Sequence, residues 1–445
     1  MIRKNQILII ARAITILGFF IFLIITGLRP PRIKGEGELE FWSPIDNKAV
    51  FQDIMDSFAE ASKGNIFVKN FVKKDLNNYE RELIDALAAG RGPDVFLIPA
   101  SWVLKHKDKI RPMPAGPEFM DIRQFQDTFV DVTATDLILN NQIYGLPLFM
   151  DTLALFYNKD ILANAGIAVP PKTWEDFQEA SRKMTKIDAL GRITQSGAAM
   201  GGWSNRYKNG NINRATDILT LLMLQVGAQM IDPNTMTAAF DKPRQDQESG
   251  ETRYPGRIAL SFYTKFSNSA SPYYSWNSQL HYSIDAFSEG TLGMMLNYAY
   301  NIPTIKAKNS RLNFGIAPAP QPKDQKFIIN YANYFAVAVS IQSRQSNAAW
   351  QFAQYITDPK NVWRYLNAAK RPTAARLYIN QQKTDPELGV FAEQALTARS
   401  WKQADPVAIE NIFNSMIESV VVGRAAVEQA IRQAATEVSL LTQKR

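Results

Sequence analysis

A carboxylate set inside an apolar run is the most promising group for chemistry in this sequence. Residues 144–160 read Tyr-Gly-Leu-Pro-Leu-Phe-Met-Asp-Thr-Leu-Ala-Leu-Phe-Tyr-Asn-Lys-Asp, and the carboxylate belongs to Asp151. An ionisable side chain rarely lies within a hydrophobic strand unless it is paired or faces a cleft. Asp151 therefore has two interpretations: a ligand-binding group in a cleft, or a buried carboxylate that caps a neighbouring helix.

The side chains that most enzymes use as nucleophile or base are scarce. The chain has no cysteine and only two histidines, His106 and His281, and neither lies in a recognisable catalytic motif. The sequence contains no phosphate-binding loop, no dinucleotide fingerprint and no His-Glu-x-x-His zinc motif. A glycosidase needs two carboxylates across a cleft, so Asp151 with a second acid keeps that alternative open. The pattern favours a protein that is not an enzyme and that uses neither a cofactor nor a metal.

The positive charge of the chain is concentrated at its N-terminus. The formal net charge is +8, and the first 35 residues hold six basic residues and no acidic one. The remaining chain is therefore nearly neutral, which excludes a phosphate-binding surface and a nucleic-acid partner.

An apolar run at the N-terminus predicts a transmembrane anchor at 7–28, followed by a tether at 29–38. A cleaved signal peptide is the alternative, but Leu-Arg-Pro-Pro-Arg at 28–32 is a poor cleavage site. Three basic residues lie on each side of the uninterrupted apolar core at 13–28, so charge does not set its orientation.

Short apolar strands alternate with helices along the body of the chain. Strands are predicted at 39–44, 65–72 and 93–98, and helices with one apolar face at 50–58 and 79–89. This order argues for parallel α/β sheets, in which ligands bind beyond the carboxyl ends of the strands. The length of 445 residues favours two lobes.

Five segments carry a resemblance to a known family. They are a strand before a helix at 40–42, a Gly-x-x-Pro-Asp strand entry at 90–95, the run at 144–160, Phe-Ser-Glu-Gly-Thr-Leu-Gly-Met-Met-Leu-Asn at 287–297, and Asn-Phe-Gly-Ile-Ala-Pro-Ala-Pro at 313–320. In this order they resemble the family 1 extracellular solute-binding proteins, the maltose-binding-like receptors of ABC importers.

The resemblance implies a two-lobe α/β fold of the periplasmic-binding-protein type II class, with an N-terminal transmembrane helix. The N-lobe is expected at 36–150 plus 333–373, and the C-lobe at 151–332 plus 374–445. The implied function is a monomeric, membrane-anchored receptor that captures a sugar or polyol between the lobes and delivers it to the permease subunits of an ABC importer. The implied location is the cell membrane, crossed once, with the large domain outside the cytoplasm. A membrane-tethered carbohydrate-active hydrolase and a ligand-free surface interaction protein on the same fold stay open as alternatives.

Sugar-type ligands need flat aromatic surfaces for their apolar faces and carboxylates or amides for their hydroxyls. The positions that match the family's cleft predict these ligand-binding residues: Ser43, Asp46, Ser101, Trp102, Asp151, Trp203, Asn205, Asn297, Tyr300 and Trp401. Trp102 has core packing as its alternative, and Asp46 has a simple turn. The segment at 44–48 is only a loose analogue of the acidic and basic pair that some family members carry there, which leaves a non-sugar ligand open.

Overall fold

The computed structural model describes residues 36–443 except 208, 246–249 and 324–325. The predicted anchor at 7–28 and most of the predicted tether lie outside the described residues. Within the described part of the chain, no helix is both long and apolar enough to cross a membrane.

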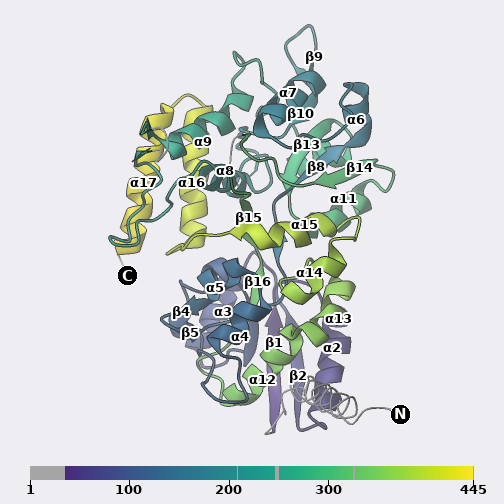
Figure 1. The fold of residues 1–445 in the computed structure, drawn as a ribbon, viewed down its shortest axis with the longest axis vertical. Coiled ribbons are helices and arrows are strands. Elements are labelled where there is room, and N and C mark those ends of the chain that lie inside the picture. The colour runs from purple at the N-terminus through teal and green to yellow at the C-terminus, as the bar shows by residue number, and fades with distance from the viewer. Residues whose placement is uncertain (1–35, 208, 246–249, 324–325, 444–445) are drawn as a thin grey trace, which may run out of the picture.

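The molecule has two α/β lobes that are stacked along its long axis (Figure 1). The N-lobe contains a five-stranded sheet in the order β2-β1-β3-β16-β6. Its strands are β1 (Gly37–Ser43), β2 (Ile66–Lys73), β3 (Val95–Pro99), β6 (Leu146–Pro147) and β16 (Phe335–Val339). Strand β1 pairs in parallel with β2 and β3, as the strand–helix alternation predicts.

Helices cover this sheet because each has one apolar face. In α2 (Lys48–Ala61) the buried residues are Phe51, Ile54, Met55 and Phe58, which confirms the predicted helical period. The other N-lobe elements are α3 (Tyr79–Ala88), α4 (Ile122–Thr128), α5 (Asp131–Leu137), α12 (Ser346–Thr357), α13 (Pro359–Ala369) and the hairpin of β4 (Ile138–Leu139) and β5 (Gln142–Ile143).

The C-lobe contains a second five-stranded sheet in the order β14-β8-β13-β10-β9. Its strands are β8 (Ala154–Asn158), β9 (Lys186–Ile187), β10 (Ile193–Ala198), β13 (Leu292–Asn297) and β14 (Phe314–Ala317). Both large sheets are mixed and not wholly parallel, since β16 runs antiparallel to β3 and β8 antiparallel to β13. These two strands lie beside the crossings between lobes, so they enter their sheets without the helical crossover that parallel pairing requires.

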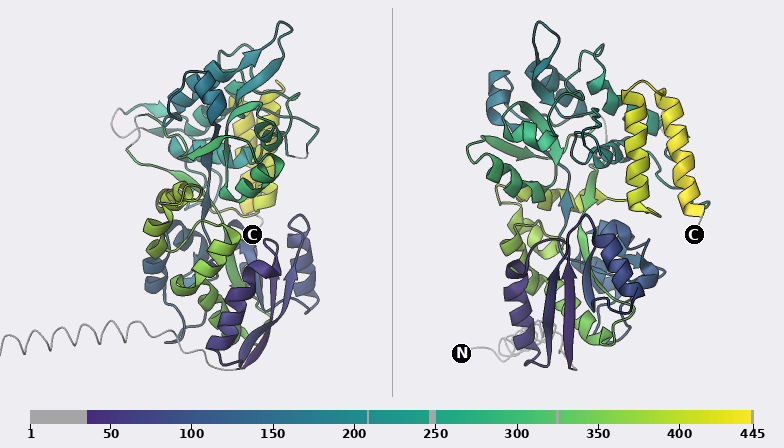
Figure 2. Two further views of the ribbon diagram at one scale, coloured as in Figure 1. Left: turned by 90° about the vertical axis from the view of Figure 1, so that its right-hand side faces the viewer. Right: turned by 180° about the vertical axis from the view of Figure 1, so that it is seen from behind.

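Helices of the C-lobe surround this sheet. They are α6 (Lys159–Asn164), α7 (Trp174–Met184), α8 (Ala215–Gln225), α9 (Pro255–Thr264), α10 (Ser283–Ser288), α11 (Ile302–Lys308), α16 (Pro406–Val421) and α17 (Val427–Gln443), with a small hairpin of β11 (Arg244–Gln245) and β12 (Thr252–Arg253). The hydroxyl of Thr173 accepts the backbone N–H of Asp176 at 3.1 Å and so caps the N-terminus of α7. Helices α16 and α17 lie side by side at one edge of the lobe (Figure 2).

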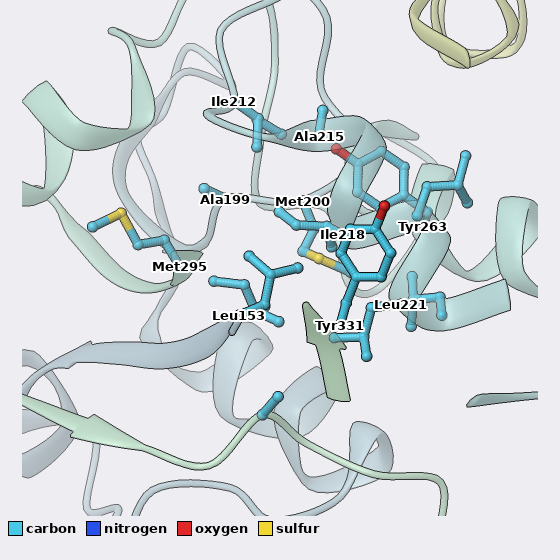
Figure 3. Close-up of a cluster of buried hydrophobic side chains, with 14 of the residues drawn as sticks. Leu153, Ala199, Met200, Ile212, Ala215, Ile218, Leu221, Tyr263, Met295 and Tyr331 are labelled. Atoms are coloured by element: carbon cyan, nitrogen blue, oxygen red, sulfur yellow. The ribbon is translucent and has the colours of Figure 1, made fainter. Parts of the chain in front are cut away.

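A three-stranded sheet in the order β17-β15-β7 joins the lobes. Its strands are β7 (Asp151–Thr152), β15 (Asn330–Asn333) and β17 (Ala398–Arg399), and we call it the hinge sheet. Two separate hydrophobic cores lie on either side of it. Figure 3 shows Tyr331 of β15 among the buried side chains of the C-lobe core, including Ile218 and Leu221 of α8.

The segment after residue 373 bridges the two cores. Ala374 and Ile379 pack in the N-lobe core, whereas Leu388 and Phe391 pack in the C-lobe core. Helices α14 (Arg376–Gln382) and α15 (Gly389–Gln394) therefore lie beside the hinge sheet, and the lobe boundary at 373 remains a prediction.

Candidate functional site

A cavity of about 330 Å³ lies between the two lobes. On the N-lobe side it is lined by Pro99 at the end of β3 and by the following turn of 3-10 helix, Ala100–Trp102. On the opposite side it is lined by residues of α8 and α16, and the hinge sheet contributes Tyr331, Ala332 and Asn333. The cavity thus lies beyond the carboxyl end of a parallel strand, where ligands bind in α/β sheets.

Aromatic side chains from both lobes form much of the wall. Trp401 stacks on Phe413 of α16, with ring centroids 6.1 Å apart and planes 21° apart. Tyr300 lies nearly parallel to the buried Tyr298, with centroids 5.6 Å apart. The aromatic residues that line the cavity are Trp102, Phe149, Tyr300, Tyr331, Tyr334, Phe335, Trp401 and Phe413. Such surfaces suit the apolar faces of a ring-shaped ligand.

Arg214 is a fixed cation in the C-lobe wall. It stands immediately before α8 with φ +57°, a left-handed conformation that is uncommon for non-glycine residues. Its Nε and Nη2 donate to the carboxylate of Asp217 at 2.8 and 2.9 Å. The hydroxyl of Tyr298 donates to the same carboxylate at 2.6 Å. Because two of its nitrogens are bonded to Asp217, the guanidinium is held in one orientation. Its remaining N–H donors are available to the cavity that Arg214 lines.

Arg371 is the corresponding cation in the N-lobe wall. Its Nη2 lies 3.0 Å from Oδ1 of Asp46, and the hydroxyl of Tyr365 donates to Oδ2 at 2.8 Å. The guanidinium also lies over the ring of Phe149, 5.2 Å from its centroid. The predicted ligand residue Asp46 is not among the residues that line the cavity, but it holds one that does.

Asp136 lies at the hinge side of the cavity. Its carboxylate accepts hydrogen bonds from the hydroxyls of Tyr334, at 2.9 Å, and Ser400. Burial among these segments raises the pKa of Asp136 to about 6, although both hydrogen bonds act in the opposite direction.

The structure places Asp151 behind the cavity and not in its wall. The side chain is 1% exposed and accepts the backbone N–H groups of Thr152, Ala299 and Tyr300 at 2.9, 3.0 and 3.2 Å. Burial raises the pKa of Asp151 to about 7 in spite of these bonds. The geometry matches the capping alternative, because Asp151 holds the turn of 3-10 helix that begins at Ala299 and carries Tyr300 to the cavity.

The remaining predicted residues divide into two groups. Ser101, Trp102, Tyr300 and Trp401 line the cavity. Ser43 and Asn297 are fully buried and bond to neighbouring backbone, whereas Trp203 and Asn205 lie in a C-lobe loop apart from the lining residues.

Several residues of the wall were not among the predicted ligand-binding residues: Asp136, Arg214, Asp217, Tyr331, Tyr334, Arg371, Ser400, Gln403 and Glu410. A local signal in the sequence could have identified Asp217 and, with it, Arg214. Asp217 is a carboxylate at the start of a strongly apolar helix, just as Asp151 is a carboxylate within an apolar strand. Asp136 and Arg371 offer no such local signal.

Comparisons with known proteins identify relatives of this chain. The family model for bacterial extracellular solute-binding proteins matches residues 74–363. A galactooligosaccharide-binding protein of Bacillus subtilis is 21% identical over 414 residues, which cover 89% of this chain and 88% of that protein. A maltotriose-binding protein of Pyrococcus abyssi is 22% identical over 338 residues, with 75% and 65% covered.

Two solved structures have the same fold. The sugar-binding protein MalE from Xanthomonas citri superposes with a TM-score of 0.72 at 19% identity, covering 92% of this chain and 98% of the other. The GacH receptor of Streptomyces glaucescens, studied unliganded and with acarbose, gives a TM-score of 0.71 at 19% identity, with 92% and 99% covered. At this level of identity the likeness establishes the two-lobe fold alone.

Proposed function

Because this chain belongs to the family of bacterial extracellular solute-binding proteins, we propose that it captures a carbohydrate between its lobes and delivers it to the permease of an ABC importer. The observation that carries the proposal is the composition of the cavity wall. Aromatic faces from both lobes stand beside two oriented guanidinium groups, Arg214 and Arg371. A sugar offers apolar ring faces and hydroxyls that accept hydrogen bonds, so this wall meets both of its surfaces.

Contacts from both lobes also explain how binding would be coupled to closure. A ligand shifts a conformational equilibrium only by its difference in affinity for the two states. Trp102 comes from the N-lobe, and Tyr300 and Arg214 from the C-lobe. A sugar that contacts both sets favours the closed state, which is the state that a permease can distinguish from the empty receptor.

The carboxylates of the cavity support binding without turnover. Asp136 bonds to Tyr334 and Ser400, and Asp217 bonds to Arg214 and Tyr298. Glu410 accepts the side-chain amide of Asn209 at 3.0 Å. A glycosidase needs an acid and a base directed at the scissile bond. These three carboxylates are instead engaged with the protein.

The membrane anchor at 7–28 is a further part of the proposal. It would tether a monomeric receptor to the cell membrane, with both lobes outside the cytoplasm. Sequencing the N-terminus of native protein from washed membranes tests this directly. An intact N-terminus in the membrane fraction supports the anchor, and a mature N-terminus near residue 30 would replace it with a cleaved signal peptide.

A thermal-shift screen tests the ligand class. The full chain would be kept in a zwitterionic detergent, since a glycoside detergent carries a sugar head group that competes for the site. The panel comprises glucose, maltose, maltotriose, galactose and galactooligosaccharides, with di- and tripeptides as controls. At one hundred times its Kd, a ligand stabilises the protein by about 2.7 kcal/mol. A shift with peptides and none with sugars would contradict the proposal, and release of monosaccharide from a bound oligomer would indicate the hydrolase.

A further inference from the structure

An ion pair joins the two lobes beside the cavity. Nζ of Lys105, in the N-lobe, lies 2.9 Å from Oδ1 of Asp405, in the C-lobe, although 300 positions separate the two residues in the sequence. Their side chains are 16% and 29% exposed, so the pair is partly shielded from water. Trp102, three residues before Lys105, and Pro406, directly after Asp405, both line the cavity. The ion pair therefore lies close to the point where the two walls of the cavity meet.

The N-lobe half of this contact is held in place by its own lobe. Nζ of Lys105 also lies 2.6 Å from Oε1 of Glu80, at the start of α3. The same oxygen lies 2.9 Å from Nε2 of His106, which is buried. Because Glu80 already fixes the ammonium group, little side-chain entropy is lost when Lys105 meets Asp405.

The C-lobe half belongs to a helix that forms part of the cavity wall. Asp405 is the N-cap of α16, and its Oδ1 accepts the backbone N–H of Ala408 at 3.2 Å. Helix α16 packs against α8, α9 and α17, so it moves with the C-lobe. Its residues Ile409, Glu410 and Phe413 line the cavity. The ion pair therefore attracts toward the N-lobe the same helix that a ligand in the cavity would contact.

We propose that the ion pair of Lys105 and Asp405 is a latch that stabilises the closed arrangement of the lobes before a ligand binds. The pair forms only when the segment after β3 and the start of α16 are close together, so opening of the hinge breaks it. An interaction that is present in one of two states shifts the equilibrium toward that state. A receptor that is already partly closed also binds its ligand with a higher apparent affinity, because the competent state is more populated.

Single-molecule fluorescence energy transfer measures the ratio of closed to open molecules in the ligand-free full chain, kept in the zwitterionic detergent. The chain has no cysteine, so Asp85→Cys and Gln433→Cys, at exposed positions on α3 and α17, carry the two dyes. Asp405→Asn removes the charge, and asparagine caps a helix as well as aspartate does. We expect this change to lower the closed-to-open ratio about two- to fivefold, as loss of a partly exposed ion pair provides.

Lys105→Met is the second variant of the latch. It keeps the apolar stem of the side chain and leaves Glu80 bonded to His106. It should lower the closed-to-open ratio to a similar extent. Because both changes remove the same interaction, the double variant should lower the ratio no further than the larger single change.

Asp285→Asn is the matched control. Oδ1 of Asp285 lies 2.9 Å from Nζ of Lys308, the same distance as in the latch. Both residues of this pair lie in the C-lobe, on α10 and α11, so the change removes an aspartate–lysine pair without affecting a contact between lobes. The closed-to-open ratio should stay unchanged.

Salt provides an independent measurement. At about 1 M NaCl the Debye length falls to about 3 Å, which screens partly exposed charges. High salt should lower the closed-to-open ratio of the unaltered protein and of Asp285→Asn, and should have little effect on Lys105→Met.

Three outcomes would overturn the latch: an unaltered closed-to-open ratio in Asp405→Asn and Lys105→Met, an equal shift in Asp285→Asn, or full additivity of the two single changes. None of these measurements requires a sugar. Failure of the latch and failure of the proposed carbohydrate binding are therefore observed separately.

Discussion

Each lobe presents one arginine to the cavity, and the two are built alike but exposed differently. Arg371 is held by Asp46 and Tyr365, and Arg214 by Asp217 and Tyr298. In each group an aspartate accepts both an arginine N–H and a tyrosine hydroxyl. The side chain of Arg371, however, is 11% exposed, whereas that of Arg214 is 30% exposed.

The difference in exposure suggests that the Arg371 group and the Arg214 group have different roles. Arg371, which follows α13, is bound to the turn after β1, 325 residues away in sequence, so it ties distant parts of the N-lobe together. Arg214 is bound to Asp217, which lies only three residues away, so this ion pair does not connect distant parts of the C-lobe. We therefore expect the N-lobe group to act mainly on stability and the C-lobe group mainly on ligand affinity.

The largest expected effect is on folding, when the N-lobe pair is broken. Asp46 has φ +53°, a conformation that asparagine tolerates, so Asp46→Asn removes the charge without new backbone strain. Leaving a buried arginine unpaired should lower the free energy of unfolding by about 3–5 kcal/mol. The matched change Asp217→Asn should cost less, because water reaches Arg214. Urea unfolding of both variants measures the difference, and an equal or larger loss for Asp217→Asn would contradict the comparison.

The second largest effect is expected on sugar affinity, when the guanidinium of Arg214 is replaced. Arg214→Lys keeps the positive charge but loses the planar donors, so sugar binding should weaken by about 1–3 kcal/mol, as for an interfacial hot spot. Arg371→Lys should change affinity less and stability more. Titration calorimetry with the best ligand of the screen decides between them. The assignment fails if Arg371→Lys proves the more damaging to binding.

A smaller effect separates aromatic residues inside and outside the cavity. Trp401→Ala removes a stacking surface from the wall and should weaken binding by about 1–2 kcal/mol. Trp203 lies outside the lining and packs beside Gly210, so Trp203→Ala should lower the apo melting temperature and leave affinity nearly unchanged. Equal losses of affinity in both variants would show that the predicted ligand role of Trp203 is correct.

Local signals in the sequence predicted the elements well. Apolar residues at helical spacing predicted a helix over 50–58, and α2 (Lys48–Ala61) contains this segment. Caps and periodicity act over a few residues, so they can be read without knowledge of the rest of the fold. Ser101 and Trp102 were predicted from the family resemblance, which implies a cleft position directly after the third strand.

The wall of the cavity depends on contacts that the sequence does not display. Asp136 meets Ser400 across 264 residues, and Asp46 meets Arg371 across 325. An acid in an apolar segment is a visible signal, but its meaning is ambiguous. Asp151 holds backbone N–H groups behind the cavity, whereas Asp217 holds an arginine in its wall. Whether a buried carboxylate bonds to backbone N–H groups or to an arginine depends on the segment that packs against it in the folded protein.

The smallest expected effect concerns pH and the buried carboxylate of Asp136 in the cavity wall. Asp136 has a pKa of about 6 in the folded protein, above the ordinary value of 3.8. The folded state therefore holds a proton at Asp136 that the unfolded chain has released, and the contribution of this group to stability falls as pH rises from about 4 through 6. Asp136→Asn keeps an acceptor for Tyr334 but cannot titrate, so its free energy of unfolding should decline less over this range than that of the unaltered protein.

Asp151, with a pKa of about 7, is present in both proteins and cancels in the difference between them. Urea unfolding of both at pH 4.5, 5.5, 6.5 and 7.5 gives that difference directly. Parallel curves would mean that Asp136 is already ionised in the folded state, with its hydrogen bonds from Tyr334 and Ser400 outweighing burial.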